Sequence, residues 1–398
     1  MTARISVTLG IVILALVVPR LALAVDSGKI VRLYQLDFEP PAGHTLAGVT
    51  DEATGRPLAI QKTAGGDYVC LVALDSATAA PSLRPVFARE DQRKDFTFLL
   101  PPNTSRGVRI RKSDGRLRIS IRGKPFTEYH YLEVPRPFFY PLRDTNGLEM
   151  TRGYPMRDDR GDEEQDHPHH RSLWFTHGSV NGHDFWAETD KSGTIRHAGF
   201  GEIVSGPVFG SFRTKNDWIA KDGTVVCTDE RVFTVYALPD ARLFDYAITI
   251  TASNGPVVFG DTKEGTMALR LAAPLRVQGK VAKAHITTSG GHSDGEAWGK
   301  RNAWVDYSGP IKDKTVGVAI FDHPSNLRHP PWWHARQYGL FAANPFGVHD
   351  FEHKPKRTGN HKLKAGERIT FRYRFYIHAG DAEQARVGEM YKVWAGQR

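Results

Sequence analysis

The chain has 398 residues, a formal net charge of +9 and a hydrophobic content of 40%. This length and composition allow one large folded domain and a smaller one, and they exclude wholesale disorder. Basic residues are scattered and no nucleic-acid motif occurs, so we expect no nucleic-acid partner. The two distant cysteines, Cys70 and Cys227, exclude a cysteine-rich zinc site and are predicted to be buried thiols.

The first 24 residues have the parts of a secretory signal peptide. Arg4 supplies the basic start, Ile5–Val18 is an apolar run, and Ala22-Leu23-Ala24 fits the cleavage pattern. The apolar run is shorter than the roughly 20 residues of a membrane span. We therefore expect cleavage after Ala24, a periplasmic or secreted protein, and no membrane span after cleavage. An uncleaved anchor is the alternative.

Residues 25–104 are predicted to form a small β domain. The runs 31–36 and 68–72 have the composition of strands, and turn-rich segments lie between them. The proline-containing stretch 101–107 is predicted to be the linker to the next domain.

Residues 105–398 are predicted to form a large antiparallel β-sandwich with a C-terminal helix. Val108–Arg111 and Leu117–Ile121 alternate apolar and polar residues around Asp114-Gly115, which predicts a hairpin. Similar alternating runs occur at 223–236, 242–252, 316–321 and 367–377. Residues 381–395 alone have a helical pattern, so the predicted fold class is mostly β.

Histidines are concentrated in the segment 163–197. Five of the chain's 17 histidines lie between Asp166 and Trp186. Imidazoles exchange protons near neutral pH and ligate metals, so the cluster predicts a functional site even though a single histidine commonly only caps a loop. Arg171 and Asp184 accompany the histidines as candidate ligand-binding residues.

Two later segments, within 261–350, add candidate residues. Lys263-Glu264 lies between two glycines at the start of a strand, where a partly buried carboxylate can act as a general base. An exposed turn is the plainer alternative for this pair. The segment from Asp322 to Gly347 combines histidine, asparagine and arginine with tryptophan, a mixture that suits sugar hydroxyls and the apolar side of a sugar ring. A proline-stiffened structural loop is the alternative there.

These segments resemble a family of uncharacterised exported bacterial proteins labelled PmoA-like or methane-oxygenase-like. The resemblance covers about residues 135–380 and is carried by Pro137–Leu142, the His167–Trp186 run, Asp261–Gly265 and Asp322–Gly347. This family is also similar to the galactose-mutarotase-like supersandwich proteins. That similarity implies a supersandwich and, by residue type alone, His170 as an acid and Glu264 as a base.

Three functions remain open on the sequence. The first is a carbohydrate-active acid–base enzyme: an epimerase, a lyase or a glycoside hydrolase. The others are a metal-dependent enzyme such as an oxygenase, with a divalent metal on His167, His169 and His334, and a non-catalytic glycan-binding module. The first function needs no cofactor, and the oligomeric state stays open. The candidate catalytic residues are His170, Glu264, Asp322 and His323. The candidate substrate-binding residues are Arg171, His177, Asp184, Lys263, Asn326, Trp333, Arg336 and Asn344.

Overall fold

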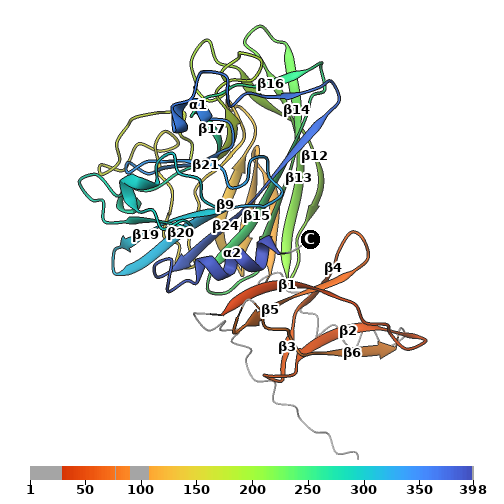
Figure 1. The fold of residues 1–398 in the computed structure, drawn as a ribbon. Helices are drawn as coiled ribbons and strands as arrows, with labels where there is room; N and C mark the ends of the chain where they lie inside the picture. The colour runs from red at the N-terminus through yellow and green to blue at the C-terminus, as the bar shows by residue number, and fades with distance from the viewer. Residues whose placement is uncertain (1–28, 77, 90–106, 397–398) are drawn as a thin grey trace, which may run out of the picture.

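In a computed structural model of the protein, the structure describes residues 29–76, 78–89 and 107–396 (Figure 1). The predicted signal peptide and the predicted domain boundary near residue 104 lie outside these residues. Two eight-stranded antiparallel sheets make up most of 107–396 and enclose a shared hydrophobic core.

The first sheet has the strand order β21-β22-β17-β11-β10-β9-β8-β7. Its strands are β7 (Val108–Ser113), β8 (Arg116–Ile121), β9 (Lys124–His130), β10 (Phe138–Phe139), β11 (Leu173–His177), β17 (Gly265–Arg270), β21 (Trp332–Ala335) and β22 (Leu340–Asn344).

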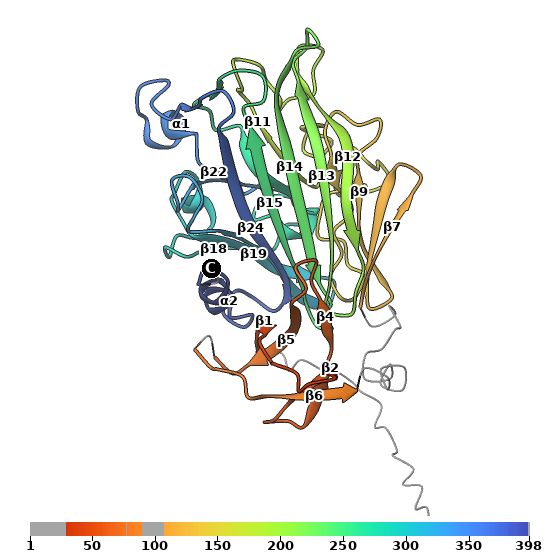
Figure 2. The same cartoon turned by 90° about the vertical axis from the view of Figure 1, so that its right-hand side faces the viewer.

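The second sheet has the order β12-β13-β14-β15-β24-β20-β19-β18. Its strands are β12 (Thr194–Val204), β13 (Phe209–Ile219), β14 (Val225–Tyr236), β15 (Arg242–Thr251), β18 (His285–Thr288), β19 (Trp304–Ile311), β20 (Lys314–Asp322) and β24 (Arg368–Ala379). In Figure 2 the long strands β12 to β15 and β24 run side by side.

Smaller elements complete the large domain. A two-stranded sheet and short helical segments lie between the long strands: β16 (Val257–Phe259), β23 (His361–Leu363), α1 (Val348–Glu352), and the 3-10 helices Ala273–Leu275 and Asp294–Ala297. Helix α2 (Val387–Ala395) ends the described chain.

The N-terminal unit contains two three-stranded sheets, of order β1-β5-β4 and β3-β2-β6. Its strands are β1 (Ile30–Leu36), β2 (His44–Asp51), β3 (Arg56–Leu58), β4 (Ile60–Lys62), β5 (Tyr68–Leu74) and β6 (Leu83–Arg89). It lies at the bottom of Figure 1 beside α2, and both share a hydrophobic cluster with the outer face of the second sheet. Gln61 fixes the junction, because its Oε1 accepts hydrogen bonds from the backbone of Val208 and Phe209 at 3.0 Å.

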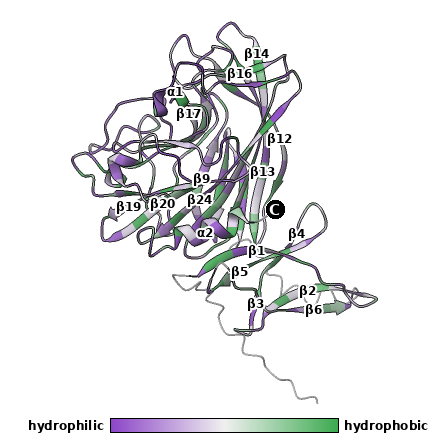
Figure 3. Ribbon diagram, viewed as in Figure 1, coloured by the Kyte–Doolittle hydropathy of each residue, from purple (hydrophilic) through white to green (hydrophobic). Residues whose placement is uncertain are grey.

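Period-two alternation explains the sandwich. In β11, Leu173 and Phe175 belong to the core between the sheets, whereas Trp174 belongs to a separate cluster on the outer face. Figure 3 shows hydrophobic residues along many of the strands and mostly hydrophilic residues in the connecting loops. The predicted hairpin is confirmed, since β7 pairs with β8 around Asp114 (φ 49°) and Gly115 (φ 72°).

The predicted fold class, an antiparallel β-sandwich with a C-terminal helix, is confirmed. The helix begins at Val387 rather than at residue 381, because the residues before it form turns. Cys70 and Cys227 are both buried and unpaired, as predicted. Within the described ranges, no helix has the length and apolar character needed to cross a membrane.

Candidate functional site

The histidine segment packs on the outer face of the first sheet. Strand register places Trp174 beside Ala268, Ala268 beside Ala342, and Ala342 beside His334. Two small side chains therefore separate Trp174 from His334 across four strands. Both alanines are fully buried, because aromatic residues of the neighbouring loops cover them.

Four aromatic rings form a column that rises from this sheet. Trp174 stacks on His170 with ring centroids 5.4 Å apart, and His170 stacks on His167 at 4.7 Å and 5° between ring planes. His167 in turn stacks on Tyr338 at 5.6 Å and 8°. The Trp174 end is buried, whereas the side chain of His167 is 43% exposed, so His167 is the histidine of this column that a ligand reaches.

One carboxylate holds His167 in place. The Nδ1 of His167 lies 2.7 Å from Oδ2 of Asp166. Burial raises the pKa of Asp166, but the charge of Arg270, the hydrogen bond from His167 and the charge of Arg152 together lower it below its usual value. Because Asp166 is ionised and can only accept, Nδ1 of His167 carries the proton and Nε2 is left for a ligand.

Two buried arginines complete this network. Arg270 donates to Asp166 Oδ1 at 2.7 Å and to Nδ1 of His170 at 3.0 Å. Arg152 also donates to Asp166 and, at 2.9 Å, to the backbone carbonyl of His167. The loop 166–170 is therefore tied to strand β17 by charge-assisted hydrogen bonds, which fix the orientation of His167.

His170 is poorly suited to the predicted role of general acid. Its side chain is almost fully buried, and its Nδ1 accepts from Arg270, a group that can only donate. Burial, followed by the neighbouring His169 and the charge of Arg270, lowers the pKa of His170 far below its usual value. The imidazole stays neutral, and its role is to support the ring of His167.

The Lys263-Glu264 turn lies on the same face of the first sheet as the histidines. The Nδ1 of His334 donates to the carbonyl of Lys263 at 3.0 Å, and the backbone N–H of Gly178 donates to the carbonyl of Glu264 at 2.7 Å. The two side chains form an ion pair at 3.1 Å and are 42% and 34% exposed. The predicted proximity of the histidine segment and this turn is therefore observed.

Tyr338 and Arg336 connect the two halves of the site. Burial raises the pKa of Tyr338; the charges of Arg270 and Arg336 oppose this, and those of Glu264 and Asp166 add to it. The phenol of Tyr338 is therefore within electrostatic range of both Glu264 and Asp166, and it stays protonated at neutral pH. The guanidinium of Arg336 lies 5.6 Å from the Tyr338 ring centroid and, in the described part of the chain, has no hydrogen-bond partner.

A search against family models decides the relationship of the chain. Residues 116–392 match the model described as "Family of unknown function (DUF6807)". The chain belongs to this family. The methane-oxygenase-like name receives no support from the match. The comparison with curated proteins gave no match.

Solved structures with similar folds include two galactosidases and a mutarotase-like protein. The GH36 α-galactosidase AgaA of Geobacillus stearothermophilus has 9% identity and a TM-score of 0.36 over 69% of this chain and 40% of its own. The α-galactosidase of Lactobacillus brevis has 8% identity and a TM-score of 0.36 over 70% and 40%. A galactose mutarotase-like protein of Lactobacillus casei has 11% identity and a TM-score of 0.29 over 68% and 100%. The chain thus spans about 40% of the length of these galactosidases.

In this member of the family, several predicted binding residues have structural roles instead. Trp333 points into the core, where its Nε1 donates to the carbonyl of Asn302, so it offers no stacking surface. His177 is also buried in the core, and its Nε2 bonds the carbonyl of Gly260 at 2.7 Å. Asn344 donates to the carbonyl of Thr262 and holds the Lys263-Glu264 turn.

Arg171 and Asp184 also have protein partners. Arg171 donates to both carboxylate oxygens of Glu188 at 2.7 to 3.0 Å. Asp184 accepts the backbone N–H groups of Trp186 and Ala187 and so stabilises a turn. Both residues shape the loop beside the ring column rather than offering free groups to a ligand.

Asp322, His323 and Asn326 do not join the histidine cluster. Asp322 is the last residue of β20 in the second sheet, and His323 and Asn326 follow it in the next loop; Asp322 accepts from Asn326 and His329 at 2.7 Å each. His323 packs 5.0 Å from Trp394 of helix α2, which covers the outer face of the second sheet. Because the sheets stack, this face is the opposite one from the face that carries His167.

The alternative metal site does not fit the geometry. No group of three or more His, Cys, Asp or Glu within the described ranges is arranged to hold a metal ion. The Nδ1 atoms of His167 and His334 are hydrogen-bonded to Asp166 and to a backbone carbonyl, so only their Nε2 atoms remain for a ligand. Burial lowers the pKa of His169 to about 4 and that of His334 to about 3, so both imidazoles are neutral at pH 7.

Sequence reasoning missed the residues that organise the site: Asp166, Arg152, Arg270 and Tyr338. Two of them left a signal in the sequence. Asp166 directly precedes the histidine run, and Arg270 is a charged residue at the end of an otherwise uncharged strand. A buried arginine in such a strand needs a partner of opposite charge. Its presence therefore predicts a carboxylate close to the strand.

Proposed function

We propose that the protein is an acid–base enzyme that acts on a sugar bound over the outer face of the first sheet. The Asp166–His167 pair carries this proposal, because it is a partly exposed imidazole whose tautomer and orientation are fixed by an ionised carboxylate. His167 takes a proton at Nε2, and Asp166 stabilises the resulting imidazolium. His167 thus replaces His170 as the proton-transferring histidine.

Glu264 is the second proton-transferring group of the proposal. Its carboxylate is partly exposed, is paired with Lys263, and acts electrostatically on the same phenol as Asp166. Epimerisation, β-elimination and glycoside hydrolysis each require one group that removes a proton and one that supplies it. The proposal therefore covers these three reactions, and the structure of the product distinguishes them.

Binding is assigned to Tyr338, Arg336 and Lys263. The Tyr338 ring stacks on His167, and its hydroxyl is a donor to a ligand at neutral pH. The unpaired guanidinium of Arg336 suits a hydroxyl or carboxylate of the ligand. We also propose that the protein acts in the periplasm or outside the cell, on the strength of its N-terminal sequence pattern.

The test compares His167→Ala with His285→Ala on a panel of glycosides and polysaccharides. His285 is a matched control, because it is an exposed histidine of the second sheet. Its Nδ1 lies 3.2 Å from Oδ2 of Asp294, so it is also paired with a carboxylate. We expect His167→Ala to lower turnover at least about 100-fold, the usual contribution of a general acid or base, and His285→Ala to leave it unchanged. Equal turnover by wild type and His167→Ala overturns the assignment. Tight binding with no product from any glycan identifies a binding module instead.

A further inference from the structure

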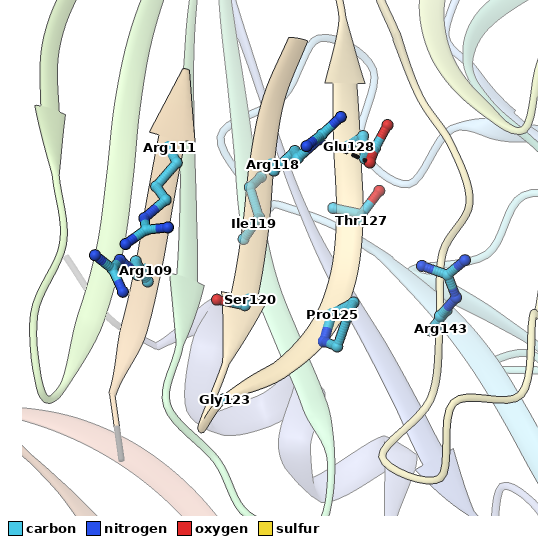
Figure 4. A pocket seen from close by; sticks show the side chains of 10 residues that line it. All are labelled: Arg109, Arg111, Arg118, Ile119, Ser120, Gly123, Pro125, Thr127, Glu128 and Arg143. Atoms are coloured by element: carbon cyan, nitrogen blue, oxygen red, sulfur yellow. Dashed lines mark ion pairs between the residues drawn. The ribbon is translucent and has the colours of Figure 1, made fainter. Parts of the chain in front are cut away.

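A basic groove lies on the same outer face of the first sheet, over β7 to β9. It has a volume of about 490 Å³, and Figure 4 shows its lining side chains. Four of the lining residues are arginines and one is a glutamate: Arg109, Arg111, Arg118, Arg143 and Glu128. The groove therefore presents an excess of positive charge.

The strand pattern explains why the arginines gather there. Val108 and Ile110 are buried in the core, so Arg109 and Arg111 point outward from β7. Arg118 lies directly opposite Arg111 on β8. Like charges opposite each other weaken a sheet, so the fold gains no stability from this pair.

Acidic residues neutralise only part of this charge. Glu128 and Asp114 each lie 3.4 Å from Arg118, and Glu149 pairs with Arg143 at 3.0 Å. Neither Arg109 nor Arg111 forms an ion pair with another described residue, and both are exposed. Their guanidinium groups are therefore available to a ligand, and their forked geometry suits carboxylate or sulfate oxygens.

The groove and the candidate site belong to one surface. The strand order β8-β9-β10-β11-β17 separates them by four strand spacings, or roughly 20 Å. A single sugar does not cover this distance, whereas an oligomer of several sugars does. The candidate site itself adds positive charge to this face through Arg336, whereas Lys263 is paired with Glu264.

From these observations we infer that the ligand is an anionic polysaccharide, with carboxylate or sulfate groups held by Arg109 and Arg111. The inference rests on the proposed function, since it takes the sugar at His167 as its starting point. A single-stranded nucleic acid is also a polyanion, but its binding sites combine positive charge with aromatic rings that stack on bases. The lining of this groove contains no aromatic residue.

The experiment measures binding of the protein to dextran sulfate, dextran, polygalacturonate and a single-stranded DNA oligonucleotide at low salt. Dextran and its sulfate share one backbone and differ in charge, and polygalacturonate tests carboxylate in place of sulfate. We expect binding to one or both acidic glycans and none to dextran. Equal affinity for dextran, or tighter binding of DNA than of either acidic glycan, overturns the inference.

Two double variants locate the binding surface. Arg109→Gln with Arg111→Gln is expected to weaken binding about five- to tenfold, as the loss of two exposed charge contacts predicts. The control, Arg196→Gln with Lys215→Gln, removes the same two charges from exposed positions on the second sheet and is expected to change nothing. Equal weakening by both pairs shows unspecific attraction and overturns the inference.

Failure of the inference and failure of the proposed function give different results. If the function is right and the inference wrong, a neutral glycan is turned over and the groove variant leaves its kcat/KM unchanged. If the function is wrong, acidic glycans bind through the groove but no glycan yields product.

Discussion

Replacing Arg270 tests whether the charge network orients His167. Arg270→Met keeps an unbranched, uncharged stem in place of the first atoms of the arginine and removes its two hydrogen bonds, to Asp166 and to His170. Loss of one partner of a buried charge pair costs about 3–5 kcal/mol. Asp166 keeps Arg152 and His167 as partners, so we expect the lower end of this range, about 3 kcal/mol.

Urea denaturation measures the stability change, and ¹⁵N NMR of the imidazoles measures the orientation of His167. In the wild type we expect the proton of His167 on Nδ1, and in Arg270→Met a mixture of tautomers. Arg242→Met is the matched control, because Arg242 is also buried but donates only to the backbone carbonyls of Leu238 and Ala241. The reasoning is refuted if Arg270→Met loses no more stability than Arg242→Met and leaves the His167 tautomer unchanged.

Three further predictions concern other parts of the chain. Burial lowers the pKa of His177 to about 4 and that of His334 to about 3. In the unfolded chain both take a proton near pH 6.5, so stability is complete above about 6.5 and falls toward pH 4, by up to about 1.4 kcal/mol per pH unit for each imidazole. His177→Gln then shows a shallower pH dependence in urea denaturation; an unchanged slope contradicts this. Asp229→Ala leaves the fully buried Arg231 without its carboxylate and is expected to cost about 3–5 kcal/mol. Part of this cost is recovered in Asp229→Leu with Arg231→Met, where Asn216 and Trp218 still lose their acceptor. If the single and double variants are equally stable, the pair has no such role. N-terminal sequencing of the exported protein is expected to begin at Val25, and a chain that still begins at Met1 contradicts cleavage.

The fold was predictable where one physical rule acts alone. Alternating residues and an Asp-Gly turn predicted the β7–β8 hairpin, and the same alternation in long runs predicted β14, β15 and β24. The two tryptophans of β21 show where this rule ends. Trp332 faces outward and Trp333 faces the core, and a shift of one residue in register exchanges them. Amino-acid composition does not determine that register. The sequence therefore predicts Trp333 at the binding surface, whereas it faces the core.

The site was predictable in its segments but not in its geometry. The histidine run and the Lys263-Glu264 turn meet because β11 and β17 pair in one sheet. The Asp322 segment had equally suggestive residues, but β20 belongs to the second sheet, and sheet membership depends on contacts between distant strands. The sequence did not show that His167 is exposed and His170 buried, because residues 163–172 form a loop, where period two gives no rule for exposure.

Charge balance differs between the histidine cluster and the basic groove. In the cluster, Arg152 and Arg270 share the carboxylate of Asp166, and the charge of Glu163 also acts on Arg152, so acidic groups of the protein balance the two buried arginines. In the groove, Arg109 and Arg111 form no ion pair with another described residue. Unpaired charge on an exposed surface costs little stability and attracts a ligand of the opposite sign. Under the proposed function, charge recognition of an acidic glycan therefore belongs to the groove, whereas the histidine cluster acts on the sugar ring.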